Sequence, residues 1–272
     1  MSQPLQAYIS DHSDNAIQTH LWRTAKNSTA YVLESGIIKP DSLILDIGCG
    51  PGTITADLAQ LAPQGKVIGI DAEEDVLAKA RQITSERGIT NVEFTMGDIH
   101  ALNYPDNTFD LVHVHQVLQH IKDPIKALQE MRRVTKPGGY VAAREGEVGT
   151  MTWYPDPDDT LVKYKAVYVG VSRSINAEPH AGRKLLSWAQ KVGFAEIKPS
   201  SSTWCYSTPK ERKWWSGIME ERVKKTSFRK NALGSGLATE AELDKYSEAW
   251  HTWGNQEDGW FSMIHGEIIC RV

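Results

Sequence analysis

Three glycines and one acidic residue in the first third of the chain have the spacing of a nucleotide site. Gly48, Gly50 and Gly52 stand two residues apart, and Asp71 follows about 20 residues later. Glycine has no Cβ atom, so it adopts positive φ angles and lets a ligand lie directly against the backbone. A carboxylate at this distance can accept both hydroxyl protons of a ribose. The pattern therefore predicts a loop and an acid that bind one nucleotide-like ligand.

Two strands and a helix must position these residues. The apolar run 43–47 predicts a buried strand that ends in the glycine loop. From Thr53 onward, apolar side chains recur at helical spacing, so the loop opens into a helix whose N-terminal amides face the ligand. A second apolar strand, 67–70, ends at Asp71. This order of elements is the first half of an α/β nucleotide-binding unit.

Further motifs follow in order along the chain. After the loop Leu-Asp-Ile-Gly-Cys-Gly-Pro-Gly-Thr and the strand Val-Ile-Gly-Ile-Asp come Gly97-Asp98-Ile99, the segment 109–120 and the segment 133–139. Residues 43–145 resemble the class I S-adenosylmethionine-dependent methyltransferases, in particular their ubiquinone and menaquinone biosynthesis-type branch. The resemblance implies S-adenosyl-L-methionine as the cofactor. Thr53 stands where a dinucleotide fingerprint has its third glycine, which disfavours a nicotinamide or flavin cofactor.

The resemblance also implies which residues hold the cofactor. Asp98 would accept a hydrogen bond from the adenine amino group, and the backbone amide of Ile99 would meet a ring nitrogen. His115 and Gln116, after the fourth predicted strand, would contact the methionine part. A carboxylate that only caps a turn is the structural alternative for Asp98. The expected cofactor contacts are Tyr8, Asp46, Gly48, Gly50, Gly52, Thr53, Asp71, Ala72, Asp98, Ile99, His115 and Gln116.

His120 and Glu145 are the candidates for proton transfer. His120 lies about a turn beyond the fourth predicted strand, which in the resembling enzymes is above the sulfonium, and an imidazole can receive a proton from an attacking hydroxyl, thiol or amine. Glu145 follows the fifth predicted strand and can hold a substrate amine or act as a base. The structural alternatives are a histidine bonded to backbone, and a Glu145 that pairs with Arg144 or solvent. The sequence does not choose one base among His12, His20, His115, His120 and Glu145.

Composition narrows the class of partner. The chain has 272 residues and a net charge of −4, and no run of Lys and Arg with interleaved aromatics, which disfavours nucleic acid and favours a small-molecule substrate. Cys49, Cys205 and Cys270 are too scattered for a disulfide framework or a zinc site, so no metal is expected. No basic, apolar leader and no 18-residue apolar run occurs, which predicts a cytoplasmic protein without a membrane span. The oligomeric state stays open.

The predicted fold is α/β, with a doubly wound, mostly parallel seven-stranded Rossmann-like sheet whose last strand is antiparallel. Residues 1–36 are expected to form a helical lid and 37–207 the cofactor-binding core. Residues 208–256 are expected to form an inserted cap of two helices, and 257–272 the closing strand. Nine tryptophans, many of them in the cap, either line a pocket for a flat, hydrophobic substrate or only pack the cap onto the sheet.

The leading functional hypothesis is methyl transfer to a small aromatic or hydrophobic molecule. The acceptor is O, N, S or an activated carbon, and transfer is an in-line displacement. One alternative is a non-catalytic protein that binds S-adenosylmethionine as a sensor or partner subunit, because fold does not dictate function. A nicotinamide-dependent oxidoreductase is a further alternative, which Thr53 and the Asp98 motif disfavour.

Overall fold

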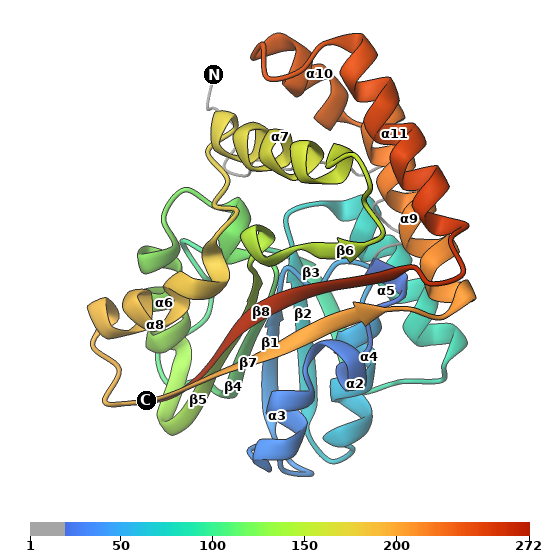
Figure 1. The fold of residues 1–272 in the computed structure, drawn as a ribbon. Coiled ribbons are helices and arrows are strands. Elements are labelled where there is room, and N and C mark those ends of the chain that lie inside the picture. The colour runs from blue at the N-terminus through green and yellow to red at the C-terminus, as the bar shows by residue number, and fades with distance from the viewer. Residues whose placement is uncertain (1–19) are drawn as a thin grey trace.

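The computed structural model describes residues 20–272 (Figure 1). Helices and strands alternate through the first half of this range, and helices dominate the second half. The elements are α2 Ala25–Ser28, α3 Ala30–Ser35, β1 Leu43–Ile47, α4 Thr53–Leu61, β2 Lys66–Asp71, α5 Glu74–Glu86, β3 Val92–Met96, β4 Phe109–His115, the 3₁₀ helix η1 Leu118–His120, α6 Pro124–Val134, β5 Thr135–Gly146, the 3₁₀ helix η2 Val148–Thr150, β6 Thr152–Tyr154, α7 Thr160–Ser174, α8 Ala181–Val192, β7 Glu196–Tyr206, α9 Pro209–Lys225, α10 Ser227–Gly234, α11 Glu240–Gly254 and β8 Trp260–Arg271.

One mixed sheet runs through the core, in the order β3-β2-β1-β4-β5-β8, with β7 on the far side of β8. Neighbours from β3 to β5 are parallel, whereas β8 is antiparallel to both β5 and β7. The predicted doubly wound fold with an antiparallel last strand is therefore confirmed. The described residues hold eight strands rather than seven, because the three-residue β6 also pairs with β8.

The register brings several strand ends to one edge. Ile47, the last residue of β1, pairs with Ile70 of β2 and with Val114 of β4. Gly48, Asp71 and His115 therefore meet at the carboxyl edge of the sheet. Strand order reverses between β1 and β4, and open α/β sheets bind ligands at such a switch point.

Two apolar layers cover the sheet. Leu45, Val112 and Val141 belong to a core that includes residues of α6 and α8. Ile44 and Leu111, the neighbours of the first two in sequence, belong to a second core with α3 and α4. Successive side chains of a strand point to opposite faces, so both faces are buried, as expected for parallel strands that are apolar throughout.

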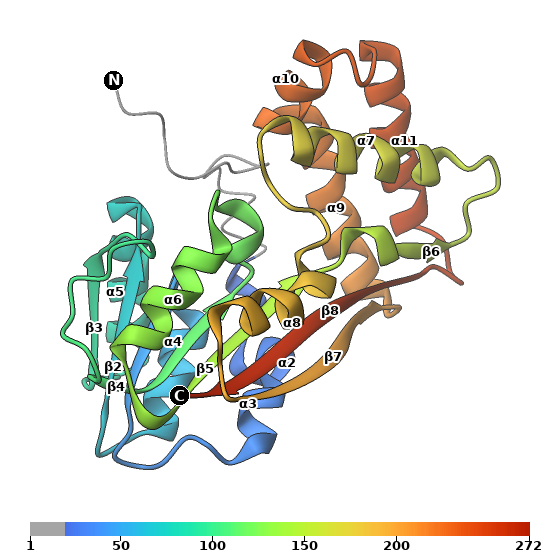
Figure 2. The ribbon, with the colours of Figure 1, turned by 90° about the vertical axis from the view of Figure 1, so that its left-hand side faces the viewer.

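A third apolar cluster forms the cap. It joins α7, α9, α10 and α11 with the ends of β7 and β8, and Figure 2 shows these two strands running from the core sheet to the helices. Residues 208–256 form three helices, not the two that the sequence predicted, because Thr226 ends α9 and its hydroxyl caps α10 at the Phe228 amide. Tyr164 of α7 packs on Tyr246 and Trp250 of α11. The division of the chain into lid, core, cap and closing strand stays a prediction.

The segment before the sheet has short helices. The predicted helix up to Gly36 appears, within the described residues, as α2 and α3 with a break at Thr29. Tyr8 and His12 lie outside the described residues. Between residues 20 and 272, no helix combines the length and the apolar character needed to cross a membrane.

Candidate active site

The glycine loop joins β1 to α4 with left-handed backbone at all three glycines. Gly48, Gly50 and Gly52 have φ of 65°, 54° and 76°. A Cβ atom at Gly48 would come within 2.3 Å of the Val117 side chain, and one at Gly52 within 2.8 Å of Ala80. Gly48 and Gly52 therefore need to be glycine for two reasons: the positive φ angle and the lack of space for a Cβ atom. The loop consequently presents bare backbone at the N-terminus of α4.

Asp71 fixes this loop to the end of β2. The backbone amide of Gly50 donates to its Oδ2 atom (2.9 Å), and that of Ala72 donates to its Oδ1 atom (2.8 Å). The backbone amide of Glu73 also donates to Oδ1 (3.3 Å), so three amides converge on this carboxylate. The sequence predicted the acid beside the loop and did not predict that it also holds the loop.

Asp46 lies beneath the loop and is buried. Its two carboxylate oxygens contact His113 Nδ1 (2.7 Å) and accept a hydrogen bond from the Thr55 hydroxyl (2.6 Å). These bonds tie β1 to β4 and to the first turn of α4, so Asp46 supports the loop from below. Its predicted contact with the cofactor stays a prediction.

Asp98 and Ile99 follow β3 at the same edge of the sheet. The side chain of Asp98 is 40% exposed, and its Oδ1 atom accepts from the backbone amide of His100 (2.8 Å) and lies 3.0 Å from Nδ1 of that ring. Ile99 is buried. His100 therefore orients the carboxylate, a part that the sequence analysis did not assign.

A pocket lies over the glycine loop. Of the predicted cofactor residues, Asp46, Gly48, Gly50, Thr53, His115 and Gln116 line it, whereas Gly52, Asp71, Ala72, Asp98 and Ile99 do not. The complete lining is His20, Arg23, Asp46, Gly48, Cys49, Gly50, Pro51, Thr53, Ile54, His115, Gln116 and His120. The sequence analysis did not assign Cys49, Pro51 and Ile54, although they adjoin the glycines. We call this space the loop pocket.

His115 and Gln116 bring polar side chains to the loop pocket. Both ring nitrogens of His115 are buried without a hydrogen-bond partner among residues 20–272. Burial, with the nearby cations Arg144 and Arg23, lowers the pKa of His115 well below its usual value, so the ring is neutral. Gln116 has a left-handed φ of 56°, and its amide nitrogen lies 2.9 Å from Nε2 of His265. Backbone amides, a carboxylate and open hydrogen-bonding atoms together suit a polar nucleotide ligand.

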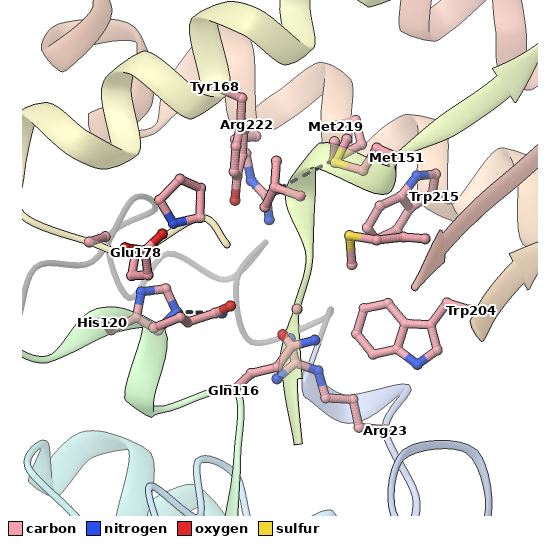
Figure 3. Close-up of a pocket in the computed structure, with 16 residues that line it drawn as sticks. Arg23, Gln116, His120, Met151, Tyr168, Glu178, Trp204, Trp215, Met219 and Arg222 are labelled. Atoms are coloured by element: carbon pink, nitrogen blue, oxygen red, sulfur yellow. Dashed lines mark hydrogen bonds between the residues drawn. The ribbon is translucent and has the colours of Figure 1, made fainter. Parts of the chain in front are cut away.

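A second pocket opens between the sheet edge and the cap (Figure 3). It shares Arg23, Gln116 and His120 with the loop pocket, so the two spaces adjoin. Most of its other walls are aromatic rings, thioethers and small apolar groups. The complete lining is Arg23, Gln116, Gln119, His120, Gly146, Val148, Met151, Tyr168, Ala177, Glu178, Pro179, Trp204, Trp215, Met219, Arg222 and Met263. We call this space the aromatic pocket.

His120 stands at the junction of the two pockets, on the turn η1. Its Nε2 atom lies 3.0 Å from Nε2 of the Gln119 side-chain amide. This turn spans only Leu118–His120. The predicted role of His120 as a proton acceptor fits its position and stays a prediction.

Glu145 holds that turn in place. Its Oε1 atom accepts from the backbone amides of Val117 (2.9 Å) and Leu118 (2.8 Å), and its Oε2 atom from that of Gln119 (3.3 Å). The side chain is fully buried, and burial raises its pKa to about 7 even though the three amides oppose the rise. The alternative pairing with Arg144 or solvent is wrong, because Arg144 pairs with Glu267 (3.2 Å). Glu145 lines neither pocket, so its geometry favours a positioning role.

The segment that precedes α2 reaches both pockets. The Thr53 hydroxyl donates to the backbone carbonyl of His20 (3.3 Å), which places this segment over the glycine loop. The guanidinium of Arg23 lies 5.6 Å from the centre of the Trp204 ring. Trp22 stacks on Trp214 of α9 with their ring centres 4.6 Å apart. These contacts join the segment to the core and to the cap.

Comparisons with known proteins agree with this architecture. A sequence model described as a methyltransferase domain matches residues 38–193. An uncharacterized methyltransferase of Schizosaccharomyces pombe is 38% identical over 100% of this chain and 99% of its own length. The demethylmenaquinone methyltransferase of Geobacillus stearothermophilus is 39% identical over 39% of this chain and 46% of its own length.

A solved structure has the same fold. The phosphoethanolamine N-methyltransferase 2 of Haemonchus contortus, in complex with S-adenosyl-L-methionine, superposes with a TM-score of 0.55 at 21% identity, over 97% of this chain and 54% of that one. The family model spans more than half of the present chain, and the matched range includes the glycine loop, Asp71 and Asp98. The chain therefore belongs to the S-adenosylmethionine-dependent methyltransferases.

Proposed function

We propose that the protein methylates a small aromatic or hydrophobic molecule that binds in the aromatic pocket. The observation that carries this proposal is the junction at Arg23, Gln116 and His120, where the aromatic pocket adjoins the loop pocket. A flat apolar molecule fits walls made of Trp204, Trp215 and thioethers, because aromatic and apolar side chains supply most of the contact area in small-molecule sites.

The loop pocket and its surroundings would hold the cofactor. Asp71 would bind the ribose hydroxyls, Asp98 and the Ile99 amide the adenine, and His115 and Gln116 the methionine part. When bound, S-adenosylmethionine supplies a methyl group activated by a sulfonium leaving group. The chain then has to hold the acceptor in line with that methyl group and exclude water, and such positioning supplies about 7–11 kcal/mol of a barrier.

His120 would accept the proton when the acceptor carries one. Among the described residues, Arg23, Gln116 and His120 line both pockets. Of these three side chains, the imidazole is the one that serves as a general base. Glu145 would act through His120 by fixing the turn η1, and it would not touch the substrate. A hydroxyl, thiol or amine acceptor needs this assistance, whereas an already ionised acceptor does not.

We also propose how the chain is divided around the two pockets. Residues 1–36 would form a lid, 37–207 the cofactor-binding core, 208–256 the cap and 257–272 the closing strand. A cytoplasmic location suits the three free cysteines, two of which are buried, and a small-molecule substrate suits the aromatic pocket.

The test is a methyl-transfer assay with cofactor that carries a deuterated methyl group. Phenols, arylamines, aryl thiols and hydroquinones are screened, and the label is followed into product by mass spectrometry. With an active phenol, His120→Asn is expected to lower turnover about 100-fold, because general base catalysis contributes at least that much. Binding of the demethylated cofactor should stay unchanged.

His251→Asn is the matched control, because His251 is exposed on α11 and contacts Glu220 outside both pockets. It should keep the full rate. Two results would contradict the proposal: no labelled product with any acceptor class although the cofactor binds, or a His120→Asn variant as fast as the control.

A further inference from the structure

We propose that the acceptor carries a second hydrogen-bond donor, a hydroxyl or amino group, next to its reacting atom, and that the side-chain oxygen of Gln116 binds this group. The inference rests on the proposed function, in which the aromatic pocket is the acceptor site. It adds a chemical feature of the acceptor and the residue that recognises it.

The backbone holds Gln116 at the junction of the two pockets. Its φ of 56° is left-handed, and its amide donates to the Arg144 carbonyl (2.8 Å). Residues other than glycine rarely adopt this conformation, and those that do cluster at functional sites. The side chain lines both the loop pocket and the aromatic pocket. In Figure 3 its carboxamide lies between His120 and Trp204, with the oxygen toward the interior of the aromatic pocket.

His265 fixes the orientation of this carboxamide. Its Nε2 atom lies 2.9 Å from Nε2 of Gln116. The ring is fully buried, and burial together with the cations Arg144 and Arg23 lowers the pKa of His265 well below its usual value, so it is neutral. A neutral imidazole has one N–H and one lone pair, whereas an amide nitrogen only donates. The nitrogen of Gln116 is therefore the donor in this pair, and its oxygen, which accepts no hydrogen bond within residues 20–272, is left for the ligand.

Gln119 has the same arrangement beside it. Its side-chain nitrogen lies 3.0 Å from Nε2 of His120, and its oxygen would lie 3.2 Å from a Cβ atom at Gly146, which lines the aromatic pocket. Both carboxamides thus direct the nitrogen to a histidine. Arg23, the cation at this end, already has partners within the chain, among them the Trp204 ring (5.6 Å). This end of the pocket therefore offers hydrogen-bond acceptors, which match a ligand that donates.

The positions of these groups define the reactive end of the acceptor. Because Gln116 and His120 both line the junction, a donor bound to Gln116 lies beside the atom that gives its proton to His120. The rest of a flat molecule then lies against Trp204 and Trp215. A ligand that covers the oxygen of Gln116 without donating to it leaves that oxygen unpaired, which costs affinity. The favoured class is an aromatic molecule with two adjacent donors, such as an aromatic 1,2-diol or an ortho-hydroxyarylamine.

The test compares ligands that differ in one donor. Naphthalene-2,3-diol, 3-methoxynaphthalen-2-ol and 2-naphthol are titrated by calorimetry into protein saturated with S-adenosylhomocysteine. We expect the diol to bind about tenfold more tightly than either of the others, because both lack the second donor. Gln116→Met keeps the length of the side chain without its amide and should bring this ratio to about one. Gln116→Glu keeps an acceptor oxygen and should keep the preference for the diol.

Gln190→Met is the control, because it makes the same exchange at an exposed residue of α8, outside both pockets. It should keep the full preference, and a general loss of affinity in any variant cancels in the ratio. Equal binding of the diol and its methyl ether by the unchanged protein would overturn the inference. So would a preference that survives in Gln116→Met or is lost in Gln116→Glu, or the absence of binding by all three ligands. These outcomes leave labelled methyl transfer to other acceptors intact, whereas failure of the proposed function removes labelled methyl transfer itself.

Discussion

The carboxyl group of Glu145 shows how a single buried residue can hold a turn that lines two pockets. Three consecutive backbone amides, from Val117 to Gln119, converge on it and fix the turn that carries His120. Burial disfavours its charged form more than these donors favour it, so its pKa rises to about 7. A group whose pKa differs between the folded and unfolded chain makes the stability of the fold depend on pH.

The sign of that dependence follows from the rise of the pKa on folding. Between about pH 4.5 and pH 7, the folded protein keeps a proton on Glu145 that the unfolded chain has released. The stabilisation from this group is fully present below pH 4.5 and is lost as the pH rises through 7. Because a tenfold change in proton affinity corresponds to about 1.4 kcal/mol, the free energy of unfolding should fall by roughly 3 kcal/mol across this window.

Urea unfolding at several pH values between 4.5 and 7.5 measures this effect. Glu145→Gln should flatten the slope of the unfolding free energy against pH. Glu93→Gln, which changes a carboxylate that is 63% exposed, should leave the slope as it is in the unchanged protein. A Glu145→Gln variant with the original slope would contradict the assigned role of burial.

Among the elements, α9 has the largest part in shaping the aromatic pocket. It supplies Trp215, Met219 and Arg222 to the lining. The helix begins with a capping box, in which the Thr208 hydroxyl accepts from the Glu211 amide and the Glu211 carboxylate accepts from the Thr208 amide (3.0 Å). The capping box therefore stabilises the first turn of the helix that carries these pocket residues.

Loss of this cap should cost measurable stability. Thr208→Ala is expected to lower the free energy of unfolding by about 1 kcal/mol, because the backbone amide of Glu211 loses its side-chain partner. Chemical denaturation measures the change. Thr208→Ser keeps a hydroxyl and should stay within a few tenths of a kcal/mol of the unchanged protein. Equal stability of the alanine and serine variants would show that the box contributes nothing.

The elements also show what sequence can predict. Strands β1 and β4 were predicted because both faces of the sheet are covered, so their residues form apolar runs. The three-residue β6 is too short to carry a pattern, and it forms only because β8 passes beside it. The break between α9 and α10 depends on the single cap at Thr226, inside a stretch that reads as helical throughout.

The residues of the site likewise fall into those that the sequence predicted and those that it did not. The glycine loop, Asp71 and Asp98 are local motifs, so their meeting at one sheet edge followed from the order of the strands. The contacts of Glu145 depend on the approach of β5 to the turn after β4, and the walls of the aromatic pocket on contact between α9 and α7. Such contacts between segments that are distant in sequence leave no local signal.

At the scale of the whole molecule, β8 joins the two halves of the site. Phe261 near its start packs in the cap cluster, and Ile268 near its end packs in the core beneath the sheet. His265 of this strand contacts Gln116, which lines both pockets (2.9 Å). The proposed reaction requires a cofactor seated over the glycine loop, with the aromatic pocket beside it.

The most direct measurement is a calorimetric titration of S-adenosylhomocysteine into the unchanged protein and into Asp71 variants, with NAD titrated in parallel. Asp71→Ala should weaken binding at least tenfold, because it removes the ribose acceptor and the bond to the Gly50 amide. Asp71→Asn, which keeps one acceptor oxygen, should lose less.

Asp41→Ala is the control, because Asp41 is exposed and precedes β1 at the opposite end of that strand. It should bind like the unchanged protein, and NAD should not bind. Undiminished affinity in Asp71→Ala, or binding of NAD in place of S-adenosylhomocysteine, would contradict the placement of the cofactor on which the whole account depends.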